Sequence, residues 1–568
     1  MDERPWFAHY DPGVPRSIAY AEIPIPSMLA RAAARAPGAT AISFLGRRIS
    51  YRELKREVDR LAAAILGLGV GKGARVAIQM PNLPQTVIAY YAALTAGAEV
   101  VLTNPLYTPR EIEHQWNDAE CVLAVTTDFL WTQRVRELRG KVGVQSFVIA
   151  SIPEVLRFPV NLLARRKLAR QSPPAIAAVR PEPGVHRFRE LVRAAPPGPP
   201  AVAIGFDDIA VLQYTGGTTG VAKAAVLTHR NLSCNVQQQA AWMSGLAGDG
   251  EVVLVALPLF HVFGMTAAMN FAVLGAAEMV LVPNPRDTAA IARAIEKRRV
   301  TLFPGVPAMY NALTNLPGIE RRDLSSLKAC FSGSAPMPPD VLERFERLTG
   351  ARILEGFGLS ETSPVTHLNP LGGPRKVGSI GIPFPDTDAR IVDVDDPSRE
   401  LGPGKEGELL LRGPQVMREY WRQPEETRFA LRDGWLATGD LAAMDEDGYF
   451  RIVGRKKDMI NCSGLKVFPD EVDAVLAAHD DVLEAATIGV PDPARGETVK
   501  SFVVLRPGRS VRAADLETFC RGRLAAYKVP REIEFLPELP KSTVLKVLRR
   551  ALREREMARR AAGGGPPA

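Results

Sequence analysis

Apolar segments of strand length alternate with helical segments along this chain, and this rhythm limits the fold more than any other feature of the sequence. In the first run we expect strands at 75–80, 99–103 and 121–126, with helices between them at 83–96 and 110–118. The rhythm resumes at Ile209 and continues to about residue 390. Such alternation is typical of doubly wound parallel sheets covered by helices. We therefore expect an α/β fold.

The length of 568 residues is too great for a single core and indicates at least two domains. Residues 390–412 form short strands with Gly and Pro turns, which predicts a small β-rich subdomain. A basic stretch at 454–458 then precedes a segment with its own order of helices and strands. We expect a large N-terminal domain at 1–454, a small mobile α+β C-terminal domain at 455–552 and a disordered, low-complexity tail at 553–568.

Composition and charge exclude several classes of protein. Hydrophobic residues make up 46% of the chain and charged residues 24%, as in globular proteins. The net charge of +8 is mild for this length, which argues against nucleic acid as a partner and weakly favours anionic ligands or a membrane surface. Five scattered cysteines form neither a disulfide framework nor a zinc pattern. Together with the lack of a signal peptide, they predict a cytoplasmic protein.

Two segments raise the question of a membrane. Residues 252–277 carry no charge and are long enough to span a bilayer, but Pro258, His261 and Asn270 interrupt them. A buried strand, a turn and a buried helix fit this run better. Residues 155–170 mix apolar and basic side chains within an insertion at 151–200. A surface insertion with a solvated basic face accounts for them, and contact with anionic membrane lipid is the alternative.

A glycine- and threonine-rich loop follows the apolar run at 209–214. It contains Thr215, Gly216, Gly217, Thr218, Thr219 and Gly220, and Lys223 comes three residues later. Glycine allows close approach of the backbone to a ligand, successive N–H groups bind anions, and a lysine adds a point charge for phosphate. The loop is not a Walker motif, because that motif places its lysine directly after the last glycine. It predicts nucleoside triphosphate binding, and a flexible turn between two elements is the plain alternative.

Five further stretches carry chemically useful residues in a fixed order. They are PLFHVFG at 258–264, EGFGLSETSP at 355–364, WLATGD at 435–440, GRKKDMINCSG at 454–464 and PKSTVLKVLRR at 540–550. Each has an ordinary structural explanation when taken alone. His261 and Phe357 are compatible with core positions, Asp440 with a helix N-cap, and Lys546 with a solvated lysine.

Together these motifs resemble the adenylate-forming superfamily of acyl-CoA synthetases, firefly luciferases and peptide-synthetase adenylation domains. The resemblance extends from about Ile25 to Leu552. It is strongest to the long-chain fatty acid–CoA ligases, which share the YTGGTTGVAK loop and a following LTHRN stretch, here at 227–231. The resemblance implies that a carboxylate attacks the α-phosphate of ATP, which gives an acyl-adenylate and pyrophosphate, and that coenzyme A then displaces AMP. Fatty acid, ATP and coenzyme A are the implied partners, and Mg²⁺ is the implied metal.

The resemblance also assigns residues to the ATP site. Thr215–Gly220 and Lys223 would hold the β- and γ-phosphates, and Thr218 and Glu361 would bind or orient Mg²⁺. Phe357 would stack on adenine, beside Gly358 and Ser360. The remaining ATP residues implied are Gly333, Ser334 and Ala335 on the other side of the adenine, Asp440 and Arg455 at the ribose, and Lys546 at the α-phosphate and substrate carboxylate.

Other implied roles concern the acyl pocket and the second half-reaction. His261 would gate the acyl pocket, and Lys546, Glu361, Thr218 and His261 form the implied catalytic set. Lys457, or Lys456 beside it, stands at the hinge about which the C-terminal domain rotates. The implied coenzyme A contacts are Gly464 in the pantetheine tunnel and Lys466 and Lys528 at the phosphates.

The sequence departs from the family pattern at a few of these positions. Leu545 stands where the family has glycine before the catalytic lysine, Phe357 replaces tyrosine, Ser360 replaces threonine, and Ala224 follows Lys223 where many relatives have glycine. Several alternatives remain open. They are an aryl acid as substrate, a carrier-protein phosphopantetheine as acceptor, and a nucleotide-binding regulatory protein without catalysis. Peripheral contact with the inner membrane face and a homodimer are also open.

Overall fold

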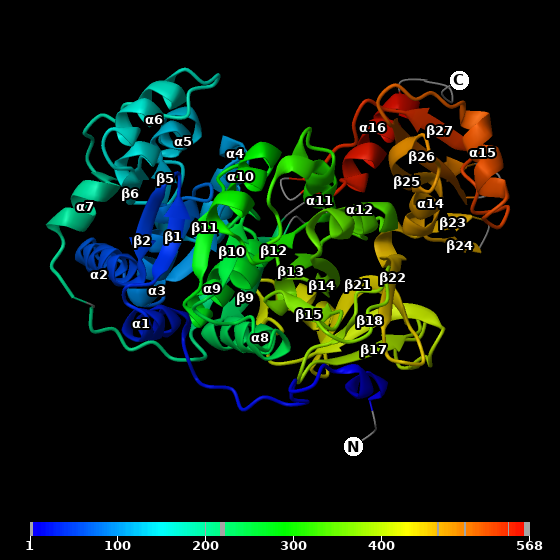
Figure 1. Ribbon diagram of the computed structural model, residues 1–568, viewed down its shortest axis with the longest axis horizontal. Coiled ribbons are helices and arrows are strands. Elements are labelled where there is room, and N and C mark those ends of the chain that lie inside the picture. Colours follow the sequence, from blue (N-terminus) through cyan, green and yellow to red (C-terminus); the bar gives the residue numbers. More distant parts are fainter. Residues whose placement is uncertain are drawn as a thin grey trace. The chain divides into compact units, whose positions relative to one another are not determined.

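The computed structural model describes residues 4–198, 200–215, 222–462, 465–492, 496–542 and 545–561, and groups the chain into two compact units (Figure 1). The larger unit contains Trp6–Asp388 and Arg412–Gly434. The smaller unit contains Met1–Pro5, Ala389–Leu411 and Trp435–Ala568. The expected boundary at 454–455 falls inside the smaller unit and stays a prediction.

The first sheet of the larger unit has the order β19-β9-β8-β4-β3-β5-β6-β7. The strands from β8 to β7 pair in parallel, whereas β8 and β9 form an antiparallel hairpin and β19 pairs antiparallel with β9. The bounds are β3 (Arg75–Gln79), β4 (Glu99–Leu102), β5 (Cys121–Thr127), β6 (Ser146–Ala150), β7 (Val185–Arg187), β8 (Ile209–Thr215), β9 (Lys223–Thr228) and β19 (Glu419–Tyr420).

The second sheet of the larger unit has the order β16-β15-β14-β13-β12-β10-β11-β1-β2. Its strands from β14 to β1 are parallel, and antiparallel strands close both edges. The bounds are β1 (Thr40–Phe44), β2 (Arg47–Ser50), β10 (Val252–Val255), β11 (Glu278–Leu281), β12 (Leu302–Gly305), β13 (Ala329–Ser332), β14 (Arg352–Gly358), β15 (Val365–Leu368) and β16 (Ile382–Pro383).

Helices connect and cover these sheets, and local sequence explains where several of them begin. Ser50 and Thr108 accept hydrogen bonds from Glu53 and Glu111 backbone N–H groups and so cap α2 and α4. The bounds are α1 (Ile25–Arg35), α2 (Tyr51–Gly67), α3 (Pro84–Thr95), α4 (Pro109–Asp118), α5 (Asp128–Leu130), α6 (Val160–Ala169), α7 (Phe188–Ala194), α8 (His229–Trp242), α9 (Phe271–Gly275), α10 (Thr288–Arg298), α11 (Pro307–Thr314), α12 (Pro339–Thr349) and α13 (Pro424–Ala430). The prediction of doubly wound parallel sheets is thereby confirmed.

The uncharged run at 252–277 folds as expected into a buried strand, a turn and buried helical turns. Strand β10 leads through the turn at Pro258 into a π-helix at Phe263–Asn270, which continues into α9. Within the described ranges, no helix is long and apolar enough to cross a membrane.

The smaller unit contains two more sheets. The β-rich subdomain expected at 390–412 is present there as β17 and β18, and it extends beyond the expected bounds to β21 and β22. Both β18 and β22 pair antiparallel with β21. The other sheet has the order β24-β23-β26-β25, with β27 on β26. The bounds are β17 (Asp388–Val392), β18 (Glu406–Arg412), β21 (Trp435–Met444), β22 (Phe450–Arg455), β23 (Ile460–Cys462), β24 (Leu465–Val467), β25 (Val482–Asp492), β26 (Gly496–Leu505), β27 (Glu532–Phe535), α14 (Pro469–Ala477), α15 (Ala513–Arg521) and α16 (Arg549–Ala561). The short strand β20 (Leu431–Arg432) belongs to the residues of the larger unit.

Part of the tail expected to be disordered is helical. Helix α16 runs through Ala561, so the expectation is wrong for 553–561. Its last turns are held because Glu556 is buried and accepts a hydrogen bond from Lys500, whose side chain is fully buried in the sheet (2.8 Å). The sequence reading missed this ion pair, because the two residues lie 56 positions apart. Residues 562–568 lie outside the described ranges.

Candidate active site

The predicted phosphate loop connects the two strands of the β8–β9 hairpin. The last residue of β8, Thr215, pairs with the first residue of β9, Lys223. The Thr215 hydroxyl donates a hydrogen bond to the Lys223 carbonyl (3.3 Å). The hairpin therefore holds the two ends of the loop together. The proposed phosphate and metal residues Gly216, Gly217, Thr218, Thr219 and Gly220 lie outside the described residues.

Lys223 lies in a small polar cluster on one side of this hairpin. Its ammonium forms an ion pair with Glu426 of α13 (2.5 Å) and lies 5.7 Å from the centre of the Tyr420 ring. Tyr420 in turn donates a hydrogen bond to the Glu361 carboxylate (2.8 Å). Strand β19 brings Tyr420 here, because Tyr420 pairs with Ala225 of β9. The structure thus links two of the predicted site residues, Lys223 and Glu361, through a tyrosine.

The protonation of Tyr420 fits this bridging position. Burial, and then the charge of Glu361, raise the pKa of Tyr420 well above its usual value. The phenol therefore stays protonated and donates to Glu361. The main chain of Glu361 is fixed as well, since its carbonyl accepts the Met417 N–H (2.7 Å). Sequence reasoning missed Tyr420 and Glu426, and no local motif marks them.

The residues expected around the adenine follow the neighbouring parallel strands β13 and β14. Gly333, Ser334 and Ala335 come directly after β13, and Phe357 and Gly358 end β14. Phe357 is half-buried and meets the ring of His367 edge-on (6.2 Å between centroids). Because carboxyl ends of adjacent parallel strands share one edge of a sheet, the two groups lie at the same edge.

Two of these glycines lie where a side chain has little or no room. A Cβ atom at Gly358 would lie 2.1 Å from the Pro364 carbonyl oxygen, and one at Gly333 would lie 3.3 Å from the Phe263 ring. Ser334 adopts a left-handed backbone with φ of 70° and is exposed. Ser360 opens the short 3₁₀ turn Ser360–Thr362 that carries Glu361. The backbone conformation at Gly333, Ser334 and Gly358 therefore shapes the edge of the sheet at which the adenine is expected.

His261 lies in the tight turn between β10 and the π-helix. Its N–H donates to the Pro258 carbonyl (3.1 Å), and its Nδ1 accepts the Phe263 N–H (3.3 Å). The carbonyl of the adjacent Phe260 accepts a hydrogen bond from Gln213 of β8 (3.3 Å). These contacts fix the turn beside β8, and the proposed gating role of His261 stays a prediction.

In the smaller unit, Asp440 and Arg455 face each other across β21 and β22. They are paired in register, and Arg455 Nε lies 2.8 Å from Asp440 Oδ1. Asp440 is only 2% exposed, and its other carboxylate oxygen, Oδ2, has no hydrogen-bond partner among the described residues. Burial raises the pKa of Asp440, while Arg455, Lys546 and Lys457 oppose the shift. A buried acceptor without a donor is costly, so Asp440 is suited to accept a hydrogen bond from a hydroxyl group of a ligand.

Lys546 belongs to the same charged group as Asp440 and Arg455. Protein atoms packed around its ammonium, and then the charge of Arg455, lower the pKa of Lys546 to about 8, although the residue as a whole keeps an exposed surface. Its backbone N–H donates to the Ser542 hydroxyl (3.2 Å), and its carbonyl accepts the Ser542 N–H (2.7 Å). These two bonds hold the backbone of Lys546 against Ser542.

The residue before this lysine has an unusual backbone. Leu545 adopts φ of 60°, in the left-handed region that favours glycine. The position therefore has the conformation that a glycine, the residue that the resemblance implies here, would adopt without strain.

The residues proposed for the hinge and for coenzyme A also belong to the smaller unit. Burial of its ammonium, and then Arg455, lower the pKa of Lys457 to about 8, while its residue stays partly in solvent. Lys456 instead pairs with Glu408 (2.9 Å). Lys528 forms an ion pair with Glu471 (2.6 Å). Gly464 lies outside the described residues.

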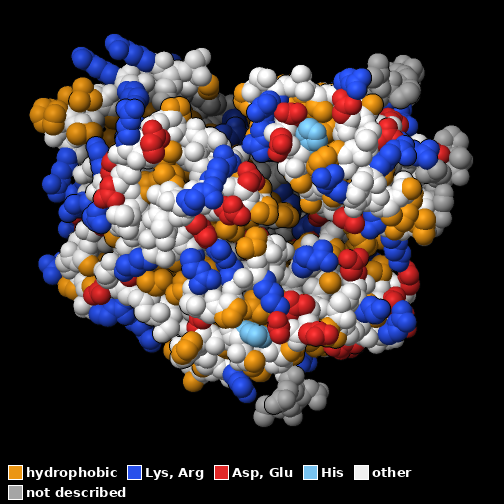
Figure 2. Space-filling model, turned by 45° about the vertical axis from the view of Figure 1, so that its right-hand side comes forward, with side chains coloured by type: hydrophobic (Ala, Val, Ile, Leu, Met, Phe, Trp, Pro, Cys, Tyr) orange, Lys and Arg blue, Asp and Glu red, His pale blue; other side chains and the backbone are white. Residues whose placement is uncertain are grey.

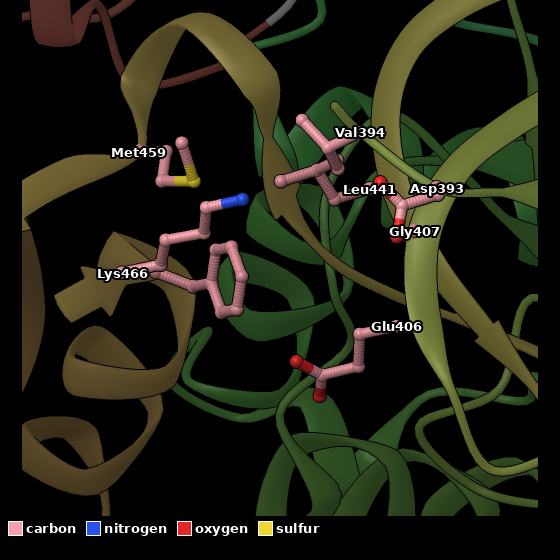
Figure 3. Close-up of a pocket in the computed structure, with 8 residues that line it drawn as sticks. Asp393, Val394, Glu406, Gly407, Leu441, Met459 and Lys466 are labelled. Atoms are coloured by element: carbon pink, nitrogen blue, oxygen red, sulfur yellow. The ribbon is translucent and has the colours of Figure 1, made fainter. Parts of the chain in front are cut away.

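Lys466 lines a pocket of about 260 Å³ in the smaller unit (Figure 3). Its ammonium pairs with Asp395 (3.1 Å), and the pocket also contains Met459 and Phe468. Asp393, Val394, Glu406, Gly407 and Leu441 complete the lining. The pocket thus combines one cation, two carboxylates and an apolar wall.

No group of three or more His, Cys, Asp or Glu side chains suited to a metal occurs in the described part of the chain. Two carboxylates lie near Lys223: Glu426 pairs with it directly, and Glu361 is linked to it through Tyr420. Mg²⁺ is usually held by one or two carboxylates together with substrate phosphates. The donor set present therefore fits a metal that arrives with a nucleotide.

Comparison with known families gives two matches along the chain. Residues 29–421 match the family of AMP-binding enzymes, and residues 471–546 match the C-terminal domain of AMP-binding enzymes. The first match alone covers more than half of the chain.

Similar proteins of known name extend over nearly the whole length. A long-chain-fatty-acid–CoA ligase of Bacillus subtilis is 43% identical over 565 residues, which cover 98% of this chain and 99% of the relative. The enzyme of the same name from Salmonella typhimurium is 42% identical over 92% of this chain and 93% of its own. A feruloyl-CoA synthase of an Amycolatopsis species is 35% identical over 92% of this chain and 97% of its own.

Solved structures agree in fold. The anthranilate CoA ligase AuaEII in complex with anthranoyl-AMP superposes with a TM-score of 0.85 at 27% identity, covering 96% of this chain and 99% of that structure. The ATP-bound MatB from Rhodopseudomonas palustris gives a TM-score of 0.81 at 29% identity, covering 93% and 98% of the two chains.

Proposed function

Because this chain belongs to the family of AMP-binding enzymes, we propose that it is an ATP-dependent long-chain fatty acid–CoA ligase. The observation that carries the proposal is 43% identity to an enzyme of that name over 98% of the chain. The buried Asp440 pairs with Arg455 through one carboxylate oxygen, and the other lacks a donor among the described residues; this supports a site for a hydroxylated ligand such as a ribose.

The first half-reaction activates the fatty acid. A carboxylate oxygen of the acid attacks the α-phosphorus of ATP, and the bond to the bridging oxygen breaks, so that pyrophosphate leaves with that electron pair. An anionic carboxylate must approach the anionic triphosphate in this step, and neutralising their charge lowers the barrier. Lys546, protonated below its pKa of about 8, supplies a positive charge at the carboxylate and α-phosphate.

The larger unit supplies the phosphate contacts. Lys223 exchanges its contact with Glu426 for the β- and γ-phosphates, and the Thr215–Gly220 loop donates N–H and hydroxyl groups. Glu361, oriented by Tyr420, and Thr218 would hold Mg²⁺, which neutralises phosphate charge when bound. Phe357 and Gly333–Ala335 enclose the adenine, with Gly358 and Ser360 at the edge of the site.

The second half-reaction transfers the acyl group. The thiolate of coenzyme A attacks the acyl carbonyl carbon, and AMP leaves with the electrons of the C–O bond. The domain beginning at residue 455 rotates about Lys457 between the half-reactions. Gly464, Lys466 and Lys528 then contact coenzyme A, which requires the two lysines to leave Asp395 and Glu471.

An aryl acid is the second candidate substrate. A feruloyl-CoA synthase is 35% identical over 92% of the chain, and the structure of an anthranilate CoA ligase superposes well. The turn at His261 would separate the acyl pocket from the nucleotide in either case. We further propose a cytoplasmic enzyme, because its five cysteines are all free and buried.

The test is ATP-dependent pyrophosphate release with straight-chain fatty acids and with aryl acids, each with and without coenzyme A. Release that requires a long-chain acid, together with formation of acyl-CoA, is the expected result. Release with aryl acids alone would move the substrate to that class. Acyl-AMP without acyl-CoA would indicate a carrier protein as acceptor, and no release with any acid would overturn the proposal.

A further inference from the structure

Helix α6 and the residues before it expose large apolar side chains. Phe158 is 77% exposed, Leu163 63%, Leu162 51% and Val160 44%. No residue of α6 is buried. Four neighbouring apolar residues in water are unusual on a folded chain, and a contiguous patch of this kind marks an interaction site.

The same segment is basic and lacks acidic residues. Residues 155–181 contain no Asp or Glu but six cations, namely Arg157, Arg165, Arg166, Lys167, Arg170 and Arg180. None of the six forms an ion pair within 4.0 Å in the part of the chain that the structure describes, although Arg165 interacts at longer range with the buried Asp128. Nearby, Arg136 and Arg139 both pair with Glu182. The α6 surface therefore carries a positive charge that no acidic side chain of the described residues neutralises at close range.

The helical period separates an inner from an outer side of α6. Asn161, Ala164 and Leu168 are half-buried and repeat at intervals of three and four residues, so they form the inner side, toward the protein. The outer arc carries Leu162 and Leu163 together with the cations from Arg165 to Arg170. Figure 2 shows basic and hydrophobic side chains next to one another at the upper left margin, the corner where Figure 1 places α6.

We propose that Phe158, Leu162 and Leu163 insert into the surface of an anionic lipid bilayer while the surrounding cations contact its headgroups. Apolar insertion and attraction to anionic lipid are the two contributions that hold a protein at a membrane surface, and neither suffices alone for a short segment. An anionic bilayer offers both at once, whereas water satisfies only the cations. This surface lies outside the residues assigned to the reaction, and it would bring the enzyme to the phase in which long-chain acids dissolve.

The experiment is flotation of the full-length chain with vesicles of phosphatidylcholine alone or mixed with phosphatidylglycerol. We expect the wild type to float only with the anionic vesicles and to be released by high salt. The charge variant R165Q/R166Q/K167Q/R170Q should bind at least about a hundredfold more weakly. The apolar variant F158S/L162S/L163S keeps every charge and should bind the anionic vesicles at least about tenfold more weakly than the wild type.

A matched control removes four cations elsewhere. The variant R321Q/R347Q/R512Q/R521Q lowers the net charge equally at side chains that are 87%, 69%, 82% and 64% exposed. It should float as the wild type does. The proposal would be overturned if this control lost as much vesicle binding as the charge variant. It would also be overturned if the charge variant or the apolar variant floated like the wild type, or if the wild type floated with neither kind of vesicle.

A second readout separates this inference from the proposed reaction. With a short, water-soluble fatty acid and no vesicles, all variants should form acyl-CoA at the wild-type rate. With a long-chain acid delivered in anionic vesicles, the charge and apolar variants should be slower. A chain that makes acyl-CoA but does not float contradicts only the membrane surface, and a chain that floats but activates no acid contradicts only the ligase.

Discussion

The two lysines assigned to ATP are prepared in opposite ways. Lys223 of the larger unit is neutralised by Glu426 at 2.5 Å and lies over Tyr420. Lys546 of the smaller unit has no ion pair among the described residues, and its pKa is lowered to about 8. A lysine paired with a carboxylate already has a counter-charge and exchanges that partner when phosphate arrives. Lys546, which lies close to the positive charge of Arg455, obtains its counter-charge from the ligand itself. Its contribution to catalysis therefore depends on the reacting carboxylate and phosphate.

The largest expected effect follows from removing the second lysine. Lys546→Ala should slow acyl-adenylate formation by about 10²- to 10³-fold, because a positive charge at the transferring phosphoryl group is lost. Single-turnover formation of acyl-AMP measures this. The reaction of preformed acyl-AMP with coenzyme A should change little. Lys541→Ala is the control, since Lys541 lies in the same segment but pairs with Glu484; a comparable loss there would contradict the assignment.

The lowered pKa predicts a pH dependence of the same step. Lys546 carries its charge below about pH 8 and loses it above. The value of kcat/KM for ATP should therefore be level below about pH 8 and fall about tenfold per pH unit above it. In Lys546→Arg this alkaline limb should disappear, because arginine stays protonated. If the limb persists in that variant, Lys457, whose pKa is also about 8, is the titrating group instead.

Lys223 should respond more weakly and mainly through substrate binding. Lys223→Met should raise the KM for ATP roughly 10- to 100-fold, as expected for one charged hydrogen bond. Glu426→Gln removes the competing carboxylate and should lower that KM by a few-fold at most, because Glu426 is 46% exposed and an exposed pair contributes little.

Glu425→Gln is the control for the competing carboxylate. This neighbour of Glu426 is 82% exposed and pairs with Arg428 instead of Lys223. Its KM for ATP should equal that of the wild type. A rise in KM for Glu426→Gln would mean that Glu426 positions Lys223 rather than competing for it.

The surroundings of Lys223 and Lys546 could be predicted from the sequence only where the contacting residues lie close together along the chain. The strand before the phosphate loop follows from local apolar pattern, and the fold class follows from the alternation of strands and helices. Tyr420 and Glu426 carry no local signal, because β19 and α13 come much later in the sequence than Lys223; Glu426 lies 203 residues after it. The carboxylate oxygen of Asp440 that lacks a donor among the described residues, and the pKa of Lys546, depend on packing within the smaller unit, which a motif does not encode.

The surface of α6 shows the same limit. The sequence of 155–170 allowed a solvated basic face as well as a membrane contact, because mixing of apolar and basic residues does not tell which of them face inward. Only the structure shows that Phe158 and Leu163 are exposed and that the inner side is taken by smaller or half-buried residues. Conversely, the motif around Lys546 identified Leu545 as unusual, and the structure supplied the physical reason.

Leu545 offers the smallest and most local test of how Lys546 is presented. Its φ of 60° costs a non-glycine residue about 1–2 kcal/mol, whereas glycine adopts this conformation freely but loses more backbone entropy on folding. Leu545→Gly should therefore raise the free energy of unfolding by up to about 1 kcal/mol. It should leave acyl-adenylate formation within about threefold of the wild type, because the backbone already has the shape that glycine would give. Urea unfolding of the full chain and single-turnover assays measure the two quantities.

The control for this substitution is Leu548→Gly in the same segment. Leu548 is 41% exposed and does not have a positive φ, so glycine there relieves no strain and should lower stability by about 0.5–1 kcal/mol. If Leu545→Gly destabilises the chain as much as Leu548→Gly does, Leu545 is held by its side-chain contacts and not strained. If it instead speeds adenylation more than about tenfold, the leucine displaces Lys546 from its working position, and the loop rather than the lysine's environment limits the first half-reaction.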